Sequence, residues 1–290
     1  TFAPFAKESF LSQVADDSFI QENVEYDIKF EWDSGFRVGL GYRTPHDQWE
    51  FAGCWTHFIT DASGTAYNRE HNYTFLPLWT SLLSGGTNIT SIDALWKFHL
   101  NLLDGDLARY IKVTDFISLK PRLGVRGGWL TQHYGVHAYF DSSLSTLTST
   151  SQMKNDFKGV GLRGALDSEW SIYRGLSIYG NAGYALLYGF FTFNQVNQTI
   201  GASGSITQTK YPYSVHQTVS MAELAAGLRW DQVVSKRVAF RLQAGWEFNA
   251  FFAQYRLVAI DFIGAQNNYY RWPNQDLTVQ GFVLSGQFSF

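Results

Sequence analysis

Apolar and polar side chains alternate with a period of two along most of this 290-residue chain. The clearest stretch is 237–255, where one face is apolar throughout. Its apolar positions are Val238, Phe240, Leu242, Ala244, Trp246, Phe248, Ala250 and Phe252. A period of two indicates a β-strand whose faces meet unlike surroundings. This strand is far longer than the about 5–6 residues usual in soluble proteins. The pattern therefore predicts an all-β protein with long strands.

Further stretches alternate in the same way, so the sequence predicts about nine strands. They are 24–42, 49–59, 96–102, 119–129, 160–170, 176–188, 222–230 and 276–290. In each stretch we expect the apolar side chains on the outer face and the polar ones on the inner face. In 96–102 the residues expected inside are Lys97, His99 and Asn101. Those expected outside are Trp96, Phe98, Leu100 and Leu102.

The composition suits a wall with lipid on one side and water on the other. Aromatic residues make up 17% of the chain and charged residues 16%, compared with about 25% charged residues in a typical soluble domain. The longest apolar stretch, 184–193, is only about half of what a membrane helix needs. Lipid cannot satisfy an open sheet edge, so long strands in a membrane must close into a barrel. The sequence therefore predicts a transmembrane antiparallel up-and-down β-barrel.

The connections between the stretches are expected to alternate in length. Short links fall near 44–48, 110–116, 173–175 and 232–236, and long ones near 60–91, 141–156, 195–212 and 256–275. Outer-membrane barrels have short periplasmic turns and long extracellular loops. No linker or break in composition divides the chain, so we expect one domain over residues 1–290.

The strand count bears on the start of the chain. If the last strand ends in the periplasm and the barrel has nine strands, the strand 24–42 must start on the extracellular side. Bacterial barrels, however, have an even number of strands. A further strand is then expected before residue 20, where residues 1–14 alternate poorly and contain Pro4. We expect residues 1–23 to form part of a first strand, in a chain that begins partway along it. The barrel would have about ten strands, within a range of roughly 10–12.

Charge and cysteine content exclude several classes of function. The net charge of -3 gives no indication of a nucleic-acid-binding surface. The single cysteine, Cys54, excludes an intrachain disulfide framework and a cysteine-based metal cluster. We expect no cofactor, no metal and no nucleic-acid partner. The expected partners are the lipid bilayer and small solutes or ions in the lumen.

Charged residues on the expected inner face are the candidate pore-lining residues. The basic ones are Arg37, Arg43, Lys97, Lys120, Arg122, Arg126, Arg163, Arg229, Arg237 and Arg241. The others are His99 and the acidic residues Glu50, Asp167, Glu169, Glu223 and Glu247. The excess of basic residues predicts a mild preference for anions, because charged rings act on permeating ions at short range. The alternative is an internal lattice of salt bridges that fills the narrow lumen.

An enzymatic function is the second hypothesis. His99 and Asn101 are expected to face inward together, and outer-membrane hydrolases place such residues on barrel walls. A catalytic triad also needs a nucleophile, and the sequence contains no G-x-S-x-G motif. We therefore expect no catalytic site. A plugged barrel that acts as a lipase, protease or adhesin through its long loops stays the alternative function.

Residues 30–58 (FEWDSGFRVGLGYRTPHDQWEFAGCWTHF) contain a glycine-spaced strand, a Pro-His-Asp turn and a Trp-rich return strand. This run resembles the pore-forming outer-membrane proteins of Legionella, a family distantly similar to the chlamydial major outer membrane protein. The likeness continues into 103–107 (LDGDL) and 120–127 (KPRLGVRG) and covers most of 24–290. A final strand that ends on Phe290 also resembles the C-terminus of bacterial outer-membrane barrels.

The resemblance implies a porin in the outer membrane of a Gram-negative bacterium, through which small hydrophilic solutes diffuse passively. It also implies a homo-oligomer, since the chlamydial relatives form trimers. Those relatives are rich in disulfide-forming cysteine, whereas this chain has one cysteine, so a cross-linked envelope network is not implied.

Overall fold

The chain is built from β-strands and their connections. The computed structural model describes residues 8–12, 23–26, 28–67, 73–76, 89–140, 147–201, 204, 206–235, 238–255, 259–263, 267–271 and 275–290. Among these residues the regular elements are all strands, so the all-β prediction is confirmed. None of the described residues belongs to a helix long and apolar enough to cross a membrane.

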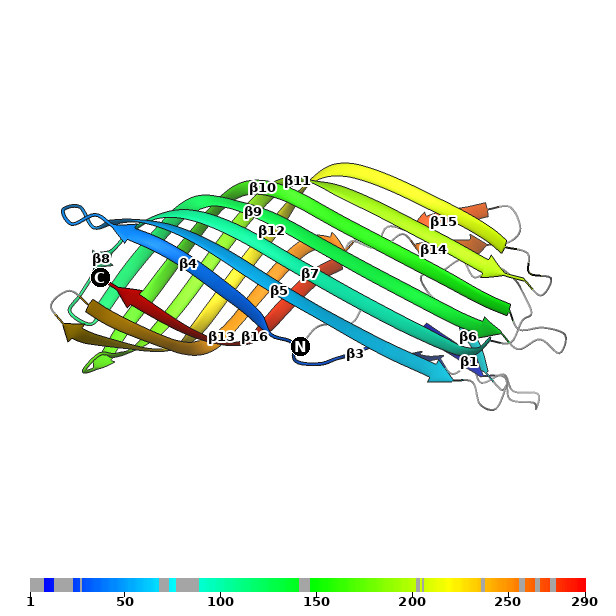
Figure 1. Cartoon of the computed structure of the whole chain (residues 1–290), viewed down its shortest axis with the longest axis horizontal. Coiled ribbons are helices and arrows are strands. Elements are labelled where there is room, and N and C mark those ends of the chain that lie inside the picture. The colour runs from blue at the N-terminus through cyan, green and yellow to red at the C-terminus, as the bar shows by residue number, and fades with distance from the viewer. Residues whose placement is uncertain are drawn as a thin grey trace.

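One large antiparallel sheet follows the order of the chain (Figure 1). Its long strands are β4 (Gly35–Arg43), β5 (Trp49–Tyr67), β7 (Ile89–Arg109), β9 (Ile117–Phe140), β10 (Leu147–Tyr173), β11 (Leu176–Ile200), β12 (Ile206–Ser235), β13 (Val238–Tyr255) and β16 (Gln275–Ser289). Two short strands, β3 (Lys29–Phe30) and β8 (Ile111–Lys112), pair with β5 and β9 and bring the sheet to 11 strands. Consecutive long strands are neighbours, so the predicted up-and-down topology is confirmed. Within the described residues, β4 and β16 lie at the two ends of the sheet.

Tight turns at one end of the sheet set the register of the long hairpins (Figure 1). Between β10 and β11, Arg174 and Gly175 both have positive φ angles, 38° and 86°. A two-residue hairpin turn requires this backbone, and glycine adopts it without strain. From this turn the two strands pair as far as Thr148↔Ile200, with one irregularity close to the turn. The short connections predicted near 44–48, 110–116 and 173–175 are confirmed.

The start of the large sheet differs from the prediction. Instead of one strand over 24–42, the chain forms β2 (Asn23–Tyr26), β3 and β4, with a break at 31–34. At this break Trp32 packs edge-on against Trp246, with ring centroids 5.9 Å apart. Asp33 accepts a hydrogen bond of 2.5 Å from the hydroxyl of Thr60. These two contacts attach the break to β13 and to β5.

The expectation that residues 1–23 extend the large sheet is not met where that segment is described. There β1 (Glu8–Ser12) pairs with β2 and with β6 (Tyr73–Leu76) in a separate three-stranded sheet. Another small sheet joins β14 (Ala259–Ile263) and β15 (Asn267–Arg271). In Figure 1 both small sheets lie at the end opposite the short turns.

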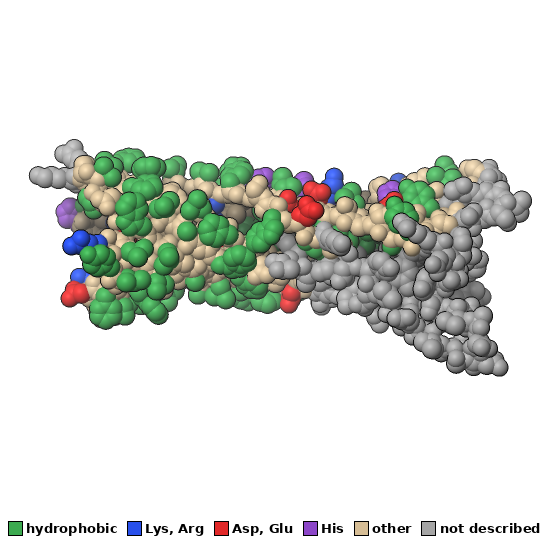
Figure 2. All heavy atoms as spheres, turned by 90° about the horizontal axis from the view of Figure 1, so that it is seen from below, with side chains coloured by type: hydrophobic (Ala, Val, Ile, Leu, Met, Phe, Trp, Pro, Cys, Tyr) green, Lys and Arg blue, Asp and Glu red, His purple; other side chains and the backbone are tan. Residues whose placement is uncertain are grey.

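In the half of the large sheet next to the short turns, the outer face is apolar. Figure 2 shows this for one side of the molecule, where hydrophobic side chains cover the half on the left. The exposed apolar residues include Val38, Leu40, Phe51, Trp55, Leu103, Leu123, Val125, Val160, Leu162, Leu186, Leu224, Leu228, Phe282 and Leu284. We call this part the lipid-facing half; it comprises residues 35–59, 101–129, 159–190, 220–250 and 280–290.

In the other half, the sides are reversed. The strands run on through stretches predicted as long loops, and β11 and β12 pair as far as Ile200↔Ile206. The inner face here is an apolar core. Its most deeply buried large members, each at most 2% exposed, include Ile92, Phe98, Leu130, Met153, Phe157, Phe191, Phe251 and Leu277. We call this part the water-facing half; it comprises residues 60–67, 89–100, 130–140, 147–158, 191–219, 251–255 and 275–279.

The reversal corrects the prediction for 96–102. Phe98 is fully buried in the interior and Trp96, Leu100 and Leu102 are buried with it, whereas Lys97 and His99 are exposed on the outer face. The alternation is as predicted, but its phase is opposite. A period of two separates the two faces of a strand without saying which face meets solvent.

Candidate functional site: the charged interior

Charged side chains gather on the inner face of the lipid-facing half. Because alternate residues point to the same face, β9 directs Lys120, Arg122 and Arg126 inward. The neighbouring strand β7 places Asp104 directly opposite Arg126 in the register. Two residues on, Asp106 lies opposite Gly124, which has no side chain to fill the space between them. Adjacent strands thus bring carboxylates against guanidinium groups.

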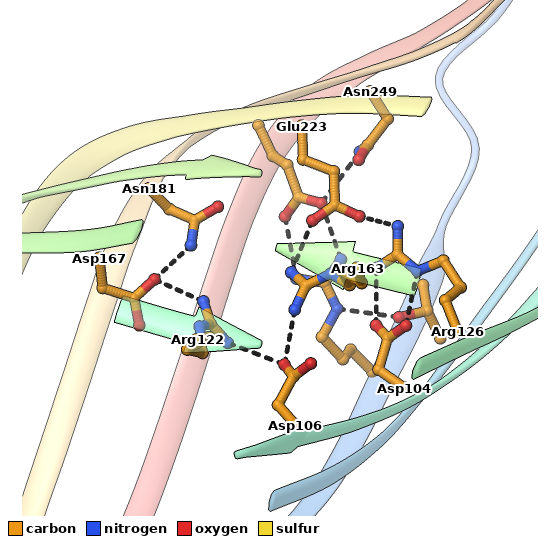
Figure 3. Close-up of polar contacts among 12 residues, drawn as sticks. Asp104, Asp106, Arg122, Arg126, Arg163, Asp167, Asn181, Glu223 and Asn249 are labelled. Carbon is orange, nitrogen blue, oxygen red and sulfur yellow. Dashed lines mark hydrogen bonds and ion pairs between the residues drawn. The ribbon is translucent and has the colours of Figure 1, made fainter. Parts of the chain in front are cut away.

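Two arginines and three carboxylates form the centre of this interior (Figure 3). Arg126 donates two hydrogen bonds to Asp104, of 2.5 Å from Nε and 2.7 Å from Nη2. Arg163 donates to Asp106 at 2.5 Å and to Glu223 at 2.7 Å. The second oxygen of Glu223 accepts from Arg126, so this one carboxylate joins both arginines. We call these five residues the central cluster.

The central cluster is almost closed to solvent. The side chains of Arg126 and Arg163 are 3% and 6% exposed. A charge at this depth is tolerated only when it is paired and hydrogen-bonded, because desolvation of an isolated ion costs several kcal/mol or more. Each arginine satisfies this condition with two carboxylates. The cluster therefore stands or falls as a unit.

A second group extends the central cluster towards the short turns. Arg122 donates to Asp167 at 2.5 Å and lies 3.7 Å from Asp106, so it connects the two groups. Asn181 on β11 donates a further hydrogen bond to Asp167, as Figure 3 shows. The Arg122 and Asp167 side chains are 23% and 20% exposed, so this layer is more open than the centre.

A third contact joins β4, at one end of the large sheet, to β13, which pairs with β16 at the other end. Arg37 on β4 donates to both carboxylate oxygens of Glu247 on β13, at 3.1 and 2.7 Å. Asn249 donates to the same carboxylate at 2.9 Å. In the register, Glu247 lies opposite Gly281 of the last strand, where no side chain occupies the inner face. The bidentate geometry is the strong form of an arginine–carboxylate pair.

The remaining inward charges pair closer to the turns. Glu50 accepts from Arg43 at 2.9 Å and from Lys120 at 2.5 Å. The other two pairs are Arg229–Glu169 at 2.6 Å and Arg241–Asp231 at 2.6 Å. Most of these side chains are partly exposed, so water reaches this end of the interior.

Positive and negative charges balance on the described inner face. The cationic residues in ion pairs are Arg37, Arg43, Lys120, Arg122, Arg126, Arg163, Arg229 and Arg241. The anionic ones are Glu50, Asp104, Asp106, Asp167, Glu169, Glu223, Asp231 and Glu247. The two sets are equal in number, unlike the basic excess expected from the sequence. The geometry corresponds to the salt-bridge lattice considered as the alternative.

The structure places the candidate pore-lining residues as follows. Lys97 and His99 lie on the outer face of the water-facing half, and the prediction that they face the interior was wrong. Arg237 lies outside the described residues. The other candidates lie on the inner face and belong to the ion-paired lattice. Whether they line a conducting pore stays a prediction.

The residues proposed for an enzymatic alternative do not meet inside the barrel. His99 is exposed on the outer face. Asn101 shares that face and lies 2.8 Å from Nδ1 of His57 through its side-chain oxygen. The same oxygen accepts from the indole of Trp55 at 3.4 Å. This arrangement is a polar contact beside tryptophan, and it does not bring His99 against a nucleophile.

The sequence prediction missed three inward carboxylates, namely Asp104, Asp106 and Asp231. The signal for the first two was present in the stretch LDGDL, where Leu103 and Leu107 alternate with the aspartates. Those leucines are exposed on the outer face and the aspartates are buried. The stretch lay just beyond 96–102, whose opposite phase obscured it.

An antiparallel sheet with an apolar outer face and a charged inner face defines a class, the β-barrel proteins of the bacterial outer membrane. The chain matches, over residues 4–290, the family described as Legionella pneumophila major outer membrane protein precursor. It belongs to that family, as the resemblance of 30–58 indicated, and it is an outer-membrane protein. No curated protein matches the chain.

Proposed function

We propose that this protein is a narrow porin through which small ions and hydrophilic solutes cross the outer membrane passively. The observation that supports this function best is the continuous polar path on the inner face of the lipid-facing half. From the short turns inward, this path runs through Glu50, Arg122 and Asp167 to the central cluster. Contact with lipid on the outer face does not require charged residues on the inner face. A lumen that holds water and ions favours such residues.

We further propose that the central cluster is the constriction. Glu223 is shared by Arg126 and Arg163, and each arginine also holds an aspartate of its own. Release of Glu223 therefore leaves neither guanidinium unpaired, so the cost is confined to the carboxylate, which must be rehydrated in the lumen. Movement of this single side chain would widen the passage while the wall keeps its other contacts.

The balance of inward charges bears on selectivity. With as many anions as cations on the described inner face, we expect only a weak preference between anions and cations. The constriction would act on permeating ions mainly through its width. An ion would also pass by briefly replacing one partner of an ion pair in the cluster. This expectation is weaker than the anion preference that the sequence predicted, because Asp104, Asp106 and Asp231 offset the basic residues.

The second candidate is a closed barrel that acts through its exposed end. The apolar core of the water-facing half favours it, because Phe98, Phe157 and Phe251 fill the interior above the central cluster. For the porin, the same packing means that the conformation described here is a closed one. The two candidates differ in whether the interior ever opens.

Single-channel recording in a planar bilayer distinguishes the candidates. We expect small stepwise currents from the purified protein, with a reversal potential close to zero in a salt gradient. Glu223→Gln should raise the conductance or the open probability, because the amide no longer carries the charge that holds both arginines. Leu228→Ala, on the outer face, is the matched control and should leave the currents unchanged. A folded protein that gives no currents at any voltage would eliminate the porin and leave the closed barrel.

A further inference from the structure

A group of basic side chains lies on the outer face where the lipid-facing half meets the water-facing half. Its members come from three adjacent strands, β7, β9 and β10, and all are exposed: Lys97, His99, His133, Lys154 and Lys158. The register places Lys97 opposite His133, and His133 opposite Lys154. Outward-facing residues two apart on one strand are also close, which brings His99 beside Lys97. We call these five residues the basic patch.

The basic patch is continuous with the lipid-facing surface. Lys158 lies opposite Trp129, and Trp129 is 43% exposed on the same face. The next outward residues towards the short turns are apolar, Leu103 on β7 and Val160 on β10. Tryptophan is typical of the level where hydrocarbon gives way to headgroups. The patch therefore begins at the headgroup level of the membrane leaflet that faces away from the short turns.

The lysines supply most of the positive charge of the patch. Burial and the neighbouring charge of Lys154 lower the pKa of His133, so this imidazole is largely neutral at neutral pH and can donate a hydrogen bond. Lys154 is paired with Asp156 at 2.7 Å. Across from Lys97 lies Asp61. Neither Lys97 nor Lys158 has an ion-pair partner within 4 Å among the described residues.

We propose that the basic patch binds the phosphate groups of phosphorylated lipids in the outer leaflet. Phosphate oxygens accept hydrogen bonds from ammonium and imidazole groups, and lysine binds phosphate as a compact charge. The acyl chains of the same lipid would lie on the apolar surface around Leu103, Trp129 and Val160. Asp156 lies between Lys154 and Lys158 on β10, and Asp61 on β5 borders the patch beside Lys97. The patch therefore suits discrete phosphates better than a uniform anionic film. This proposal depends on the outer-membrane location and is independent of pore activity.

Lipid retention in vesicles tests the proposal. The protein is reconstituted in phosphatidylcholine vesicles that contain either diphosphorylated lipid A or the same lipid without phosphate, and bound lipid is measured by native mass spectrometry after mild detergent extraction. We expect the wild-type protein to retain the diphosphorylated lipid preferentially. In Lys97→Gln/Lys158→Gln the preference should fall about tenfold or more, because each lysine near a charged headgroup contributes about fivefold in affinity.

A matched double variant at other exposed lysines, Lys112→Gln/Lys210→Gln, should keep the preference. Inorganic phosphate added to the extracted complex should displace little lipid, because it lacks the apolar contacts. Equal retention of the two lipids by the wild-type protein would overturn the proposal, and so would an equal loss in both double variants. If inorganic phosphate displaced the lipid completely at millimolar concentration, the site would be one for free phosphate, and the lipid assignment would be wrong. Unchanged channel currents in Lys97→Gln/Lys158→Gln would show that the variant folds.

Discussion

The lipid-facing and water-facing halves are made of the same strands, yet they put their apolar side chains on opposite sides. In β9, Leu123 and Val125 are exposed on the outer face, while Leu130 and Tyr134 are buried inside. The pairing of β9 with β10 is continuous from Phe140 to Ile117, so no bulge turns the strand over. In the lipid-facing half the apolar side chains thus point outward, towards hydrocarbon. In the water-facing half they point inward, into the core.

The point of reversal is marked by two adjacent apolar residues that point to opposite faces. In Leu102–Leu103 the first residue is 3% exposed and the second 52%. In Trp129–Leu130 the order is reversed, 43% and then 1%, because β9 runs the other way. In Leu186–Leu187 the fractions are 50% and 0%. Such apolar doublets mark where the apolar side chains of a long strand change from the outer to the inner face.

The largest expected effect concerns the charged interior of the lipid-facing half. Arg126→Leu should lower the free energy of unfolding by about 3–5 kcal/mol, because Asp104 and Glu223 would each lose a buried partner. Denaturant titration in detergent micelles measures the change. Arg43→Leu is the control: its side chain is 53% exposed, so we expect about 1 kcal/mol at most. Equal losses of stability in the two variants would mean that the burial of an ion pair does not determine its contribution to stability.

The next effect concerns the apolar interior of the water-facing half. Leu130→Ala should cost about 2–5 kcal/mol through lost burial and the cavity left behind. Leu123→Ala, on the outer face of the same strand, should cost less because lipid can fill the space. The same denaturant titration compares the two variants. A larger loss at Leu123 would contradict the assignment of the two faces.

A charge on the outer face sharpens the boundary between the halves. Leu162→Arg should destabilise the protein by about 2–4 kcal/mol if Leu162 lies near the bilayer midplane. Lys158→Leu, on the same face of β10 and beyond the boundary, should change stability little. Folding in vesicles, followed by the mobility of unheated samples in gel electrophoresis, measures both. Similar stability of the two variants would mean that the boundary between the halves lies elsewhere.

The smallest expected effect concerns the outer surface of the water-facing half. Lys154→Gln removes one partner of an ion pair with Asp156, in which the lysine side chain is 46% exposed. We expect a change within about 1 kcal/mol, because exposed pairs gain little and salt screens them. Measurement at low and high salt should give nearly the same stability. A loss as large as that of Arg126→Leu would contradict the solvent exposure of this face.

The sequence was sufficient to locate the strands and to assign many of the charged residues to the inner face. Period-two alternation located the strand from Val238 to Tyr255 closely, and in β10 it assigned Arg163 and Asp167 to the inner face correctly. These assignments succeeded because exposed Val160, Leu162 and Leu166 lie within the lipid-facing half. There the apolar face is the outer face.

The same rule failed at Lys97 and His99 because these residues lie beyond the reversal. Local alternation contains no term for the medium outside, so the phase must come from elsewhere, here from the doublet at Leu102–Leu103. The sequence also failed to predict that positive and negative charges on the inner face are equal in number, for a related reason. Asp106 pairs with Arg163, which lies 57 positions away in the sequence, and no local pattern encodes such a partner.

Results

Sequence analysis

Apolar and polar side chains alternate with a period of two along most of this 290-residue chain. The clearest stretch is 237–255, where one face is apolar throughout. Its apolar positions are Val238, Phe240, Leu242, Ala244, Trp246, Phe248, Ala250 and Phe252. A period of two indicates a β-strand whose faces meet unlike surroundings. This strand is far longer than the about 5–6 residues usual in soluble proteins. The pattern therefore predicts an all-β protein with long strands.

Further stretches alternate in the same way, so the sequence predicts about nine strands. They are 24–42, 49–59, 96–102, 119–129, 160–170, 176–188, 222–230 and 276–290. In each stretch we expect the apolar side chains on the outer face and the polar ones on the inner face. In 96–102 the residues expected inside are Lys97, His99 and Asn101. Those expected outside are Trp96, Phe98, Leu100 and Leu102.

The composition suits a wall with lipid on one side and water on the other. Aromatic residues make up 17% of the chain and charged residues 16%, compared with about 25% charged residues in a typical soluble domain. The longest apolar stretch, 184–193, is only about half of what a membrane helix needs. Lipid cannot satisfy an open sheet edge, so long strands in a membrane must close into a barrel. The sequence therefore predicts a transmembrane antiparallel up-and-down β-barrel.

The connections between the stretches are expected to alternate in length. Short links fall near 44–48, 110–116, 173–175 and 232–236, and long ones near 60–91, 141–156, 195–212 and 256–275. Outer-membrane barrels have short periplasmic turns and long extracellular loops. No linker or break in composition divides the chain, so we expect one domain over residues 1–290.

The strand count bears on the start of the chain. If the last strand ends in the periplasm and the barrel has nine strands, the strand 24–42 must start on the extracellular side. Bacterial barrels, however, have an even number of strands. A further strand is then expected before residue 20, where residues 1–14 alternate poorly and contain Pro4. We expect residues 1–23 to form part of a first strand, in a chain that begins partway along it. The barrel would have about ten strands, within a range of roughly 10–12.

Charge and cysteine content exclude several classes of function. The net charge of -3 gives no indication of a nucleic-acid-binding surface. The single cysteine, Cys54, excludes an intrachain disulfide framework and a cysteine-based metal cluster. We expect no cofactor, no metal and no nucleic-acid partner. The expected partners are the lipid bilayer and small solutes or ions in the lumen.

Charged residues on the expected inner face are the candidate pore-lining residues. The basic ones are Arg37, Arg43, Lys97, Lys120, Arg122, Arg126, Arg163, Arg229, Arg237 and Arg241. The others are His99 and the acidic residues Glu50, Asp167, Glu169, Glu223 and Glu247. The excess of basic residues predicts a mild preference for anions, because charged rings act on permeating ions at short range. The alternative is an internal lattice of salt bridges that fills the narrow lumen.

An enzymatic function is the second hypothesis. His99 and Asn101 are expected to face inward together, and outer-membrane hydrolases place such residues on barrel walls. A catalytic triad also needs a nucleophile, and the sequence contains no G-x-S-x-G motif. We therefore expect no catalytic site. A plugged barrel that acts as a lipase, protease or adhesin through its long loops stays the alternative function.

Residues 30–58 (FEWDSGFRVGLGYRTPHDQWEFAGCWTHF) contain a glycine-spaced strand, a Pro-His-Asp turn and a Trp-rich return strand. This run resembles the pore-forming outer-membrane proteins of Legionella, a family distantly similar to the chlamydial major outer membrane protein. The likeness continues into 103–107 (LDGDL) and 120–127 (KPRLGVRG) and covers most of 24–290. A final strand that ends on Phe290 also resembles the C-terminus of bacterial outer-membrane barrels.

The resemblance implies a porin in the outer membrane of a Gram-negative bacterium, through which small hydrophilic solutes diffuse passively. It also implies a homo-oligomer, since the chlamydial relatives form trimers. Those relatives are rich in disulfide-forming cysteine, whereas this chain has one cysteine, so a cross-linked envelope network is not implied.

Overall fold

The described part of the chain is built from β-strands and their connections. The computed structural model describes residues 8–12, 23–26, 28–67, 73–76, 89–140, 147–201, 204, 206–235, 238–255, 259–263, 267–271 and 275–290. Among these residues the regular elements are all strands, so the all-β prediction is confirmed. None of the described residues belongs to a helix long and apolar enough to cross a membrane.

One large antiparallel sheet follows the order of the chain (Figure 1). Its long strands are β4 (Gly35–Arg43), β5 (Trp49–Tyr67), β7 (Ile89–Arg109), β9 (Ile117–Phe140), β10 (Leu147–Tyr173), β11 (Leu176–Ile200), β12 (Ile206–Ser235), β13 (Val238–Tyr255) and β16 (Gln275–Ser289). Two short strands, β3 (Lys29–Phe30) and β8 (Ile111–Lys112), pair with β5 and β9 and bring the sheet to 11 strands. Consecutive long strands are neighbours, so the predicted up-and-down topology is confirmed. Within the described residues, β4 and β16 lie at the two ends of the sheet.

Tight turns at one end of the sheet set the register of the long hairpins (Figure 1). Between β10 and β11, Arg174 and Gly175 both have positive φ angles, 38° and 86°. A two-residue hairpin turn requires this backbone, and glycine adopts it without strain. From this turn the two strands pair as far as Thr148↔Ile200, with one irregularity close to the turn. The short connections predicted near 44–48, 110–116 and 173–175 are confirmed.

The start of the large sheet differs from the prediction. Instead of one strand over 24–42, the chain forms β2 (Asn23–Tyr26), β3 and β4, with a break at 31–34. At this break Trp32 packs edge-on against Trp246, with ring centroids 5.9 Å apart. Asp33 accepts a hydrogen bond of 2.5 Å from the hydroxyl of Thr60. These two contacts attach the break to β13 and to β5.

The expectation that residues 1–23 extend the large sheet is not met where that segment is described. There β1 (Glu8–Ser12) pairs with β2 and with β6 (Tyr73–Leu76) in a separate three-stranded sheet. Another small sheet joins β14 (Ala259–Ile263) and β15 (Asn267–Arg271). In Figure 1 both small sheets lie at the end opposite the short turns.

In the half of the large sheet next to the short turns, the outer face is apolar. Figure 2 shows this for one side of the molecule, where hydrophobic side chains cover the half on the left. The exposed apolar residues include Val38, Leu40, Phe51, Trp55, Leu103, Leu123, Val125, Val160, Leu162, Leu186, Leu224, Leu228, Phe282 and Leu284. We call this part the lipid-facing half; it comprises residues 35–59, 101–129, 159–190, 220–250 and 280–290.

In the other half of the sheet, the two sides are reversed. The strands run on through stretches predicted as long loops, and β11 and β12 pair as far as Ile200↔Ile206. The inner face here is an apolar core. Its most deeply buried large members, each at most 2% exposed, include Ile92, Phe98, Leu130, Met153, Phe157, Phe191, Phe251 and Leu277. We call this part the water-facing half; it comprises residues 60–67, 89–100, 130–140, 147–158, 191–219, 251–255 and 275–279.

The reversal corrects the prediction for 96–102. Phe98 is fully buried in the interior and Trp96, Leu100 and Leu102 are buried with it, whereas Lys97 and His99 are exposed on the outer face. The alternation is as predicted, but its phase is opposite. A period of two separates the two faces of a strand without saying which face meets solvent.

Candidate functional site: the charged interior

Charged side chains gather on the inner face of the lipid-facing half. Because alternate residues point to the same face, β9 directs Lys120, Arg122 and Arg126 inward. The neighbouring strand β7 places Asp104 directly opposite Arg126 in the register. Two residues on, Asp106 lies opposite Gly124, which has no side chain to fill the space there. Adjacent strands thus bring carboxylates against guanidinium groups.

Two arginines and three carboxylates form the centre of this interior (Figure 3). Arg126 donates two hydrogen bonds to Asp104, of 2.5 Å from Nε and 2.7 Å from Nη2. Arg163 donates to Asp106 at 2.5 Å and to Glu223 at 2.7 Å. The second oxygen of Glu223 accepts from Arg126, so this one carboxylate joins both arginines. We call these five residues the central cluster.

The central cluster is almost closed to solvent. The side chains of Arg126 and Arg163 are 3% and 6% exposed. A charge at this depth is tolerated only when it is paired and hydrogen-bonded, because desolvation of an isolated ion costs several kcal/mol or more. Each arginine satisfies this condition with two carboxylates. The five side chains therefore depend on one another for their stability.

A second group extends the central cluster towards the short turns. Arg122 donates to Asp167 at 2.5 Å and lies 3.7 Å from Asp106, so it connects the two groups. Asn181 on β11 donates a further hydrogen bond to Asp167, as Figure 3 shows. The Arg122 and Asp167 side chains are 23% and 20% exposed, so this layer is more open than the centre.

A third contact joins β4, at one end of the large sheet, to β13, which pairs with β16 at the other end. Arg37 on β4 donates to both carboxylate oxygens of Glu247 on β13, at 3.1 and 2.7 Å. Asn249 donates to the same carboxylate at 2.9 Å. In the register, Glu247 lies opposite Gly281 of β16, where no side chain occupies the inner face. The bidentate geometry is the strong form of an arginine–carboxylate pair.

The remaining inward charges pair closer to the turns. Glu50 accepts from Arg43 at 2.9 Å and from Lys120 at 2.5 Å. The other two pairs are Arg229–Glu169 at 2.6 Å and Arg241–Asp231 at 2.6 Å. Most of these side chains are partly exposed, so water reaches this end of the interior.

Positive and negative charges balance on the described inner face. The cationic residues in ion pairs are Arg37, Arg43, Lys120, Arg122, Arg126, Arg163, Arg229 and Arg241. The anionic ones are Glu50, Asp104, Asp106, Asp167, Glu169, Glu223, Asp231 and Glu247. The two sets are equal in number, unlike the basic excess expected from the sequence. The geometry corresponds to the salt-bridge lattice considered as the alternative.

The structure separates the candidate pore-lining residues into three groups. Lys97 and His99 lie on the outer face of the water-facing half, and the prediction that they face the interior was wrong. Arg237 lies outside the described residues. The other candidates lie on the inner face and belong to the ion-paired lattice. Whether they line a conducting pore stays a prediction.

The residues considered for an enzymatic function do not meet inside the sheet. His99 is exposed on the outer face. Asn101 shares that face, and its side-chain oxygen lies 2.8 Å from Nδ1 of His57. The same oxygen accepts from the indole of Trp55 at 3.4 Å. This arrangement is a polar contact beside tryptophan, and it does not bring His99 against a nucleophile.

The sequence prediction missed three inward carboxylates, namely Asp104, Asp106 and Asp231. The signal for the first two was present in the stretch LDGDL, where Leu103 and Leu107 alternate with the aspartates. Those leucines are exposed on the outer face and the aspartates are buried. The stretch follows 96–102 directly, and the phase assigned to 96–102 would have placed the aspartates outside.

An antiparallel sheet with an apolar outer face and a charged inner face defines a class, the β-barrel proteins of the bacterial outer membrane. The chain matches, over residues 4–290, the family described as Legionella pneumophila major outer membrane protein precursor. It belongs to that family, as the resemblance of 30–58 indicated, and it is an outer-membrane protein. No curated protein matches the chain.

Proposed function

We propose that this protein is a narrow porin through which small ions and hydrophilic solutes cross the outer membrane passively. The observation that supports this function best is the continuous polar path on the inner face of the lipid-facing half. From the short turns inward, this path runs through Glu50, Arg122 and Asp167 to the central cluster. Contact with lipid on the outer face does not require charged residues on the inner face. A lumen that holds water and ions favours such residues.

The central cluster is the constriction in this proposal. Glu223 is shared by Arg126 and Arg163, and each arginine also holds an aspartate of its own. Release of Glu223 therefore leaves neither guanidinium unpaired, so the cost is confined to the carboxylate, which must be rehydrated in the lumen. Movement of this single side chain would widen the passage while the wall keeps its other contacts.

The balance of inward charges bears on selectivity. With as many anions as cations on the described inner face, we expect only a weak preference between permeating anions and cations. The constriction would act on permeating ions mainly through its width. An ion would also pass by briefly replacing one partner of an ion pair in the cluster. This expectation is weaker than the anion preference that the sequence predicted, because Asp104, Asp106 and Asp231 offset the basic residues.

The second candidate is a closed barrel that acts through its exposed end. The apolar core of the water-facing half favours it, because Phe98, Phe157 and Phe251 fill the interior beyond the central cluster. For the porin, the same packing means that the conformation described here is a closed one. The two candidates differ in whether the interior ever opens.

Single-channel recording in a planar bilayer distinguishes the candidates. We expect small stepwise currents from the purified protein, with a reversal potential close to zero in a salt gradient. Glu223→Gln should raise the conductance or the open probability, because the amide no longer carries the charge that holds both arginines. Leu228→Ala, on the outer face, is the matched control and should leave the currents unchanged. A folded protein that gives no currents at any voltage would eliminate the porin and leave the closed barrel.

A further inference from the structure

A group of basic side chains lies on the outer face where the lipid-facing half meets the water-facing half. Its members come from three adjacent strands, β7, β9 and β10, and all are exposed: Lys97, His99, His133, Lys154 and Lys158. The register places Lys97 opposite His133, and His133 opposite Lys154. Residues two apart on one strand share a face, which brings His99 beside Lys97. We call these five residues the basic patch.

The basic patch is continuous with the lipid-facing surface. Lys158 lies opposite Trp129, and Trp129 is 43% exposed on the same face. Closer to the short turns the exposed residues are apolar, with Leu103 on β7 and Val160 on β10. Tryptophan is typical of the level where hydrocarbon gives way to headgroups. The patch therefore begins at the headgroup level of the membrane leaflet that faces away from the short turns.

The lysines supply most of the positive charge of the patch. Burial and the neighbouring charge of Lys154 lower the pKa of His133, so this imidazole is largely neutral at neutral pH and can donate a hydrogen bond. Lys154 is paired with Asp156 at 2.7 Å, and Asp61 lies across from Lys97 in the register. Among the described residues, Lys97 and Lys158 have no ion-pair partner within 4.0 Å.

We propose that the basic patch binds the phosphate groups of phosphorylated lipids in the outer leaflet. Phosphate oxygens accept hydrogen bonds from ammonium and imidazole groups, and lysine binds phosphate as a compact charge. The acyl chains of the same lipid would lie on the apolar surface around Leu103, Trp129 and Val160. Asp156 lies between Lys154 and Lys158 on β10, and Asp61 on β5 borders the patch beside Lys97. The patch therefore suits discrete phosphates better than a uniform anionic film. This proposal depends on the outer-membrane location and is independent of pore activity.

Lipid retention after reconstitution tests the proposal. The protein is placed in phosphatidylcholine vesicles that contain either diphosphorylated lipid A or the same lipid without phosphate. Bound lipid is then measured by native mass spectrometry after mild detergent extraction. We expect the wild-type protein to retain the diphosphorylated lipid preferentially. In Lys97→Gln/Lys158→Gln the preference should fall about tenfold or more, because each lysine near a charged headgroup contributes about fivefold in affinity.

A matched double variant at other exposed lysines, Lys112→Gln/Lys210→Gln, should keep the preference. Inorganic phosphate added to the extracted complex should displace little lipid, because it lacks the apolar contacts. Equal retention of the two lipids by the wild-type protein would overturn the proposal, and so would an equal loss in both double variants. If inorganic phosphate displaced the lipid completely, the site would be one for free phosphate and the lipid assignment would be wrong. Far-ultraviolet circular dichroism identical to that of the wild-type protein establishes that both double variants fold.

Discussion

The lipid-facing and water-facing halves are made of the same strands, yet they put their apolar side chains on opposite sides. In β9, Leu123 and Val125 are exposed on the outer face, while Leu130 and Tyr134 are buried inside. The pairing of β9 with β10 is continuous along β9 from Phe140 to Ile117, so no bulge turns the strand over. In the lipid-facing half the apolar side chains thus point outward, towards hydrocarbon. In the water-facing half they point inward, into the core.

The point of reversal is marked by two adjacent apolar residues that point to opposite faces. In Leu102–Leu103 the first residue is 3% exposed and the second 52%. In Trp129–Leu130 the order is reversed, 43% and then 1%, because β9 runs in the other direction. Such apolar doublets mark where the apolar side chains of a long strand change from the outer to the inner face.

The largest expected effect concerns the charged interior of the lipid-facing half. Arg126→Leu should lower the free energy of unfolding by about 3–5 kcal/mol, because Asp104 and Glu223 would each lose a buried partner. Denaturant titration in detergent micelles measures the change. Arg43→Leu is the control: its side chain is 53% exposed, so we expect about 1 kcal/mol at most. Equal losses of stability in the two variants would mean that the burial of an ion pair does not determine its contribution to stability.

The next effect concerns the apolar interior of the water-facing half. Leu130→Ala should cost about 2–5 kcal/mol through lost burial and the cavity left behind. Leu123→Ala, on the outer face of the same strand, should cost less because lipid can fill the space. The same denaturant titration compares the two variants. A larger loss at Leu123 would contradict the assignment of the two faces.

A charge on the outer face tests where the boundary between the halves lies. Leu162→Arg should destabilise the protein by about 2–4 kcal/mol if Leu162 lies near the bilayer midplane. Lys158→Leu, on the same face of β10 and beyond the boundary, should change stability little. Folding in vesicles, followed by the mobility of unheated samples in gel electrophoresis, measures both. Similar stability of the two variants would mean that the boundary between the halves lies elsewhere.

The smallest expected effect concerns the outer surface of the water-facing half. Lys154→Gln removes one partner of the ion pair with Asp156, in which the lysine side chain is 46% exposed. We expect a change within about 1 kcal/mol, because exposed pairs gain little and salt screens them. Measurements at low and high salt should give nearly the same stability. A loss as large as that of Arg126→Leu would contradict the solvent exposure of this face.

Period-two alternation was sufficient to locate the strands and to assign many of the charged residues to the inner face. It located the strand from Val238 to Tyr255 closely, and in β10 it assigned Arg163 and Asp167 to the inner face. The assignment in β10 succeeded because Leu162 and its apolar neighbours lie in the lipid-facing half. There the apolar face is the outer face.

The same rule failed at Lys97 and His99 because these residues lie beyond the reversal. Local alternation contains no information about the medium outside, so the phase must come from another signal, such as the doublet Leu102–Leu103. The sequence also failed to predict that positive and negative charges on the inner face are equal in number, for a related reason. Asp106 pairs with Arg163, which lies 57 positions away in the sequence, and no local pattern encodes such a partner.

The contact between Arg37 and Glu247 has a consequence for biogenesis. Its two residues are 210 positions apart, so we expect the pair to form after most of the intervening hairpins have docked and shortened the effective loop. Closing a loop of that length before the hairpins form would be entropically unfavourable. Cysteines introduced at these two sites would consequently cross-link mainly in chains whose strands have assembled from β4 to β13, and the yield of that cross-link would measure the fraction of such chains.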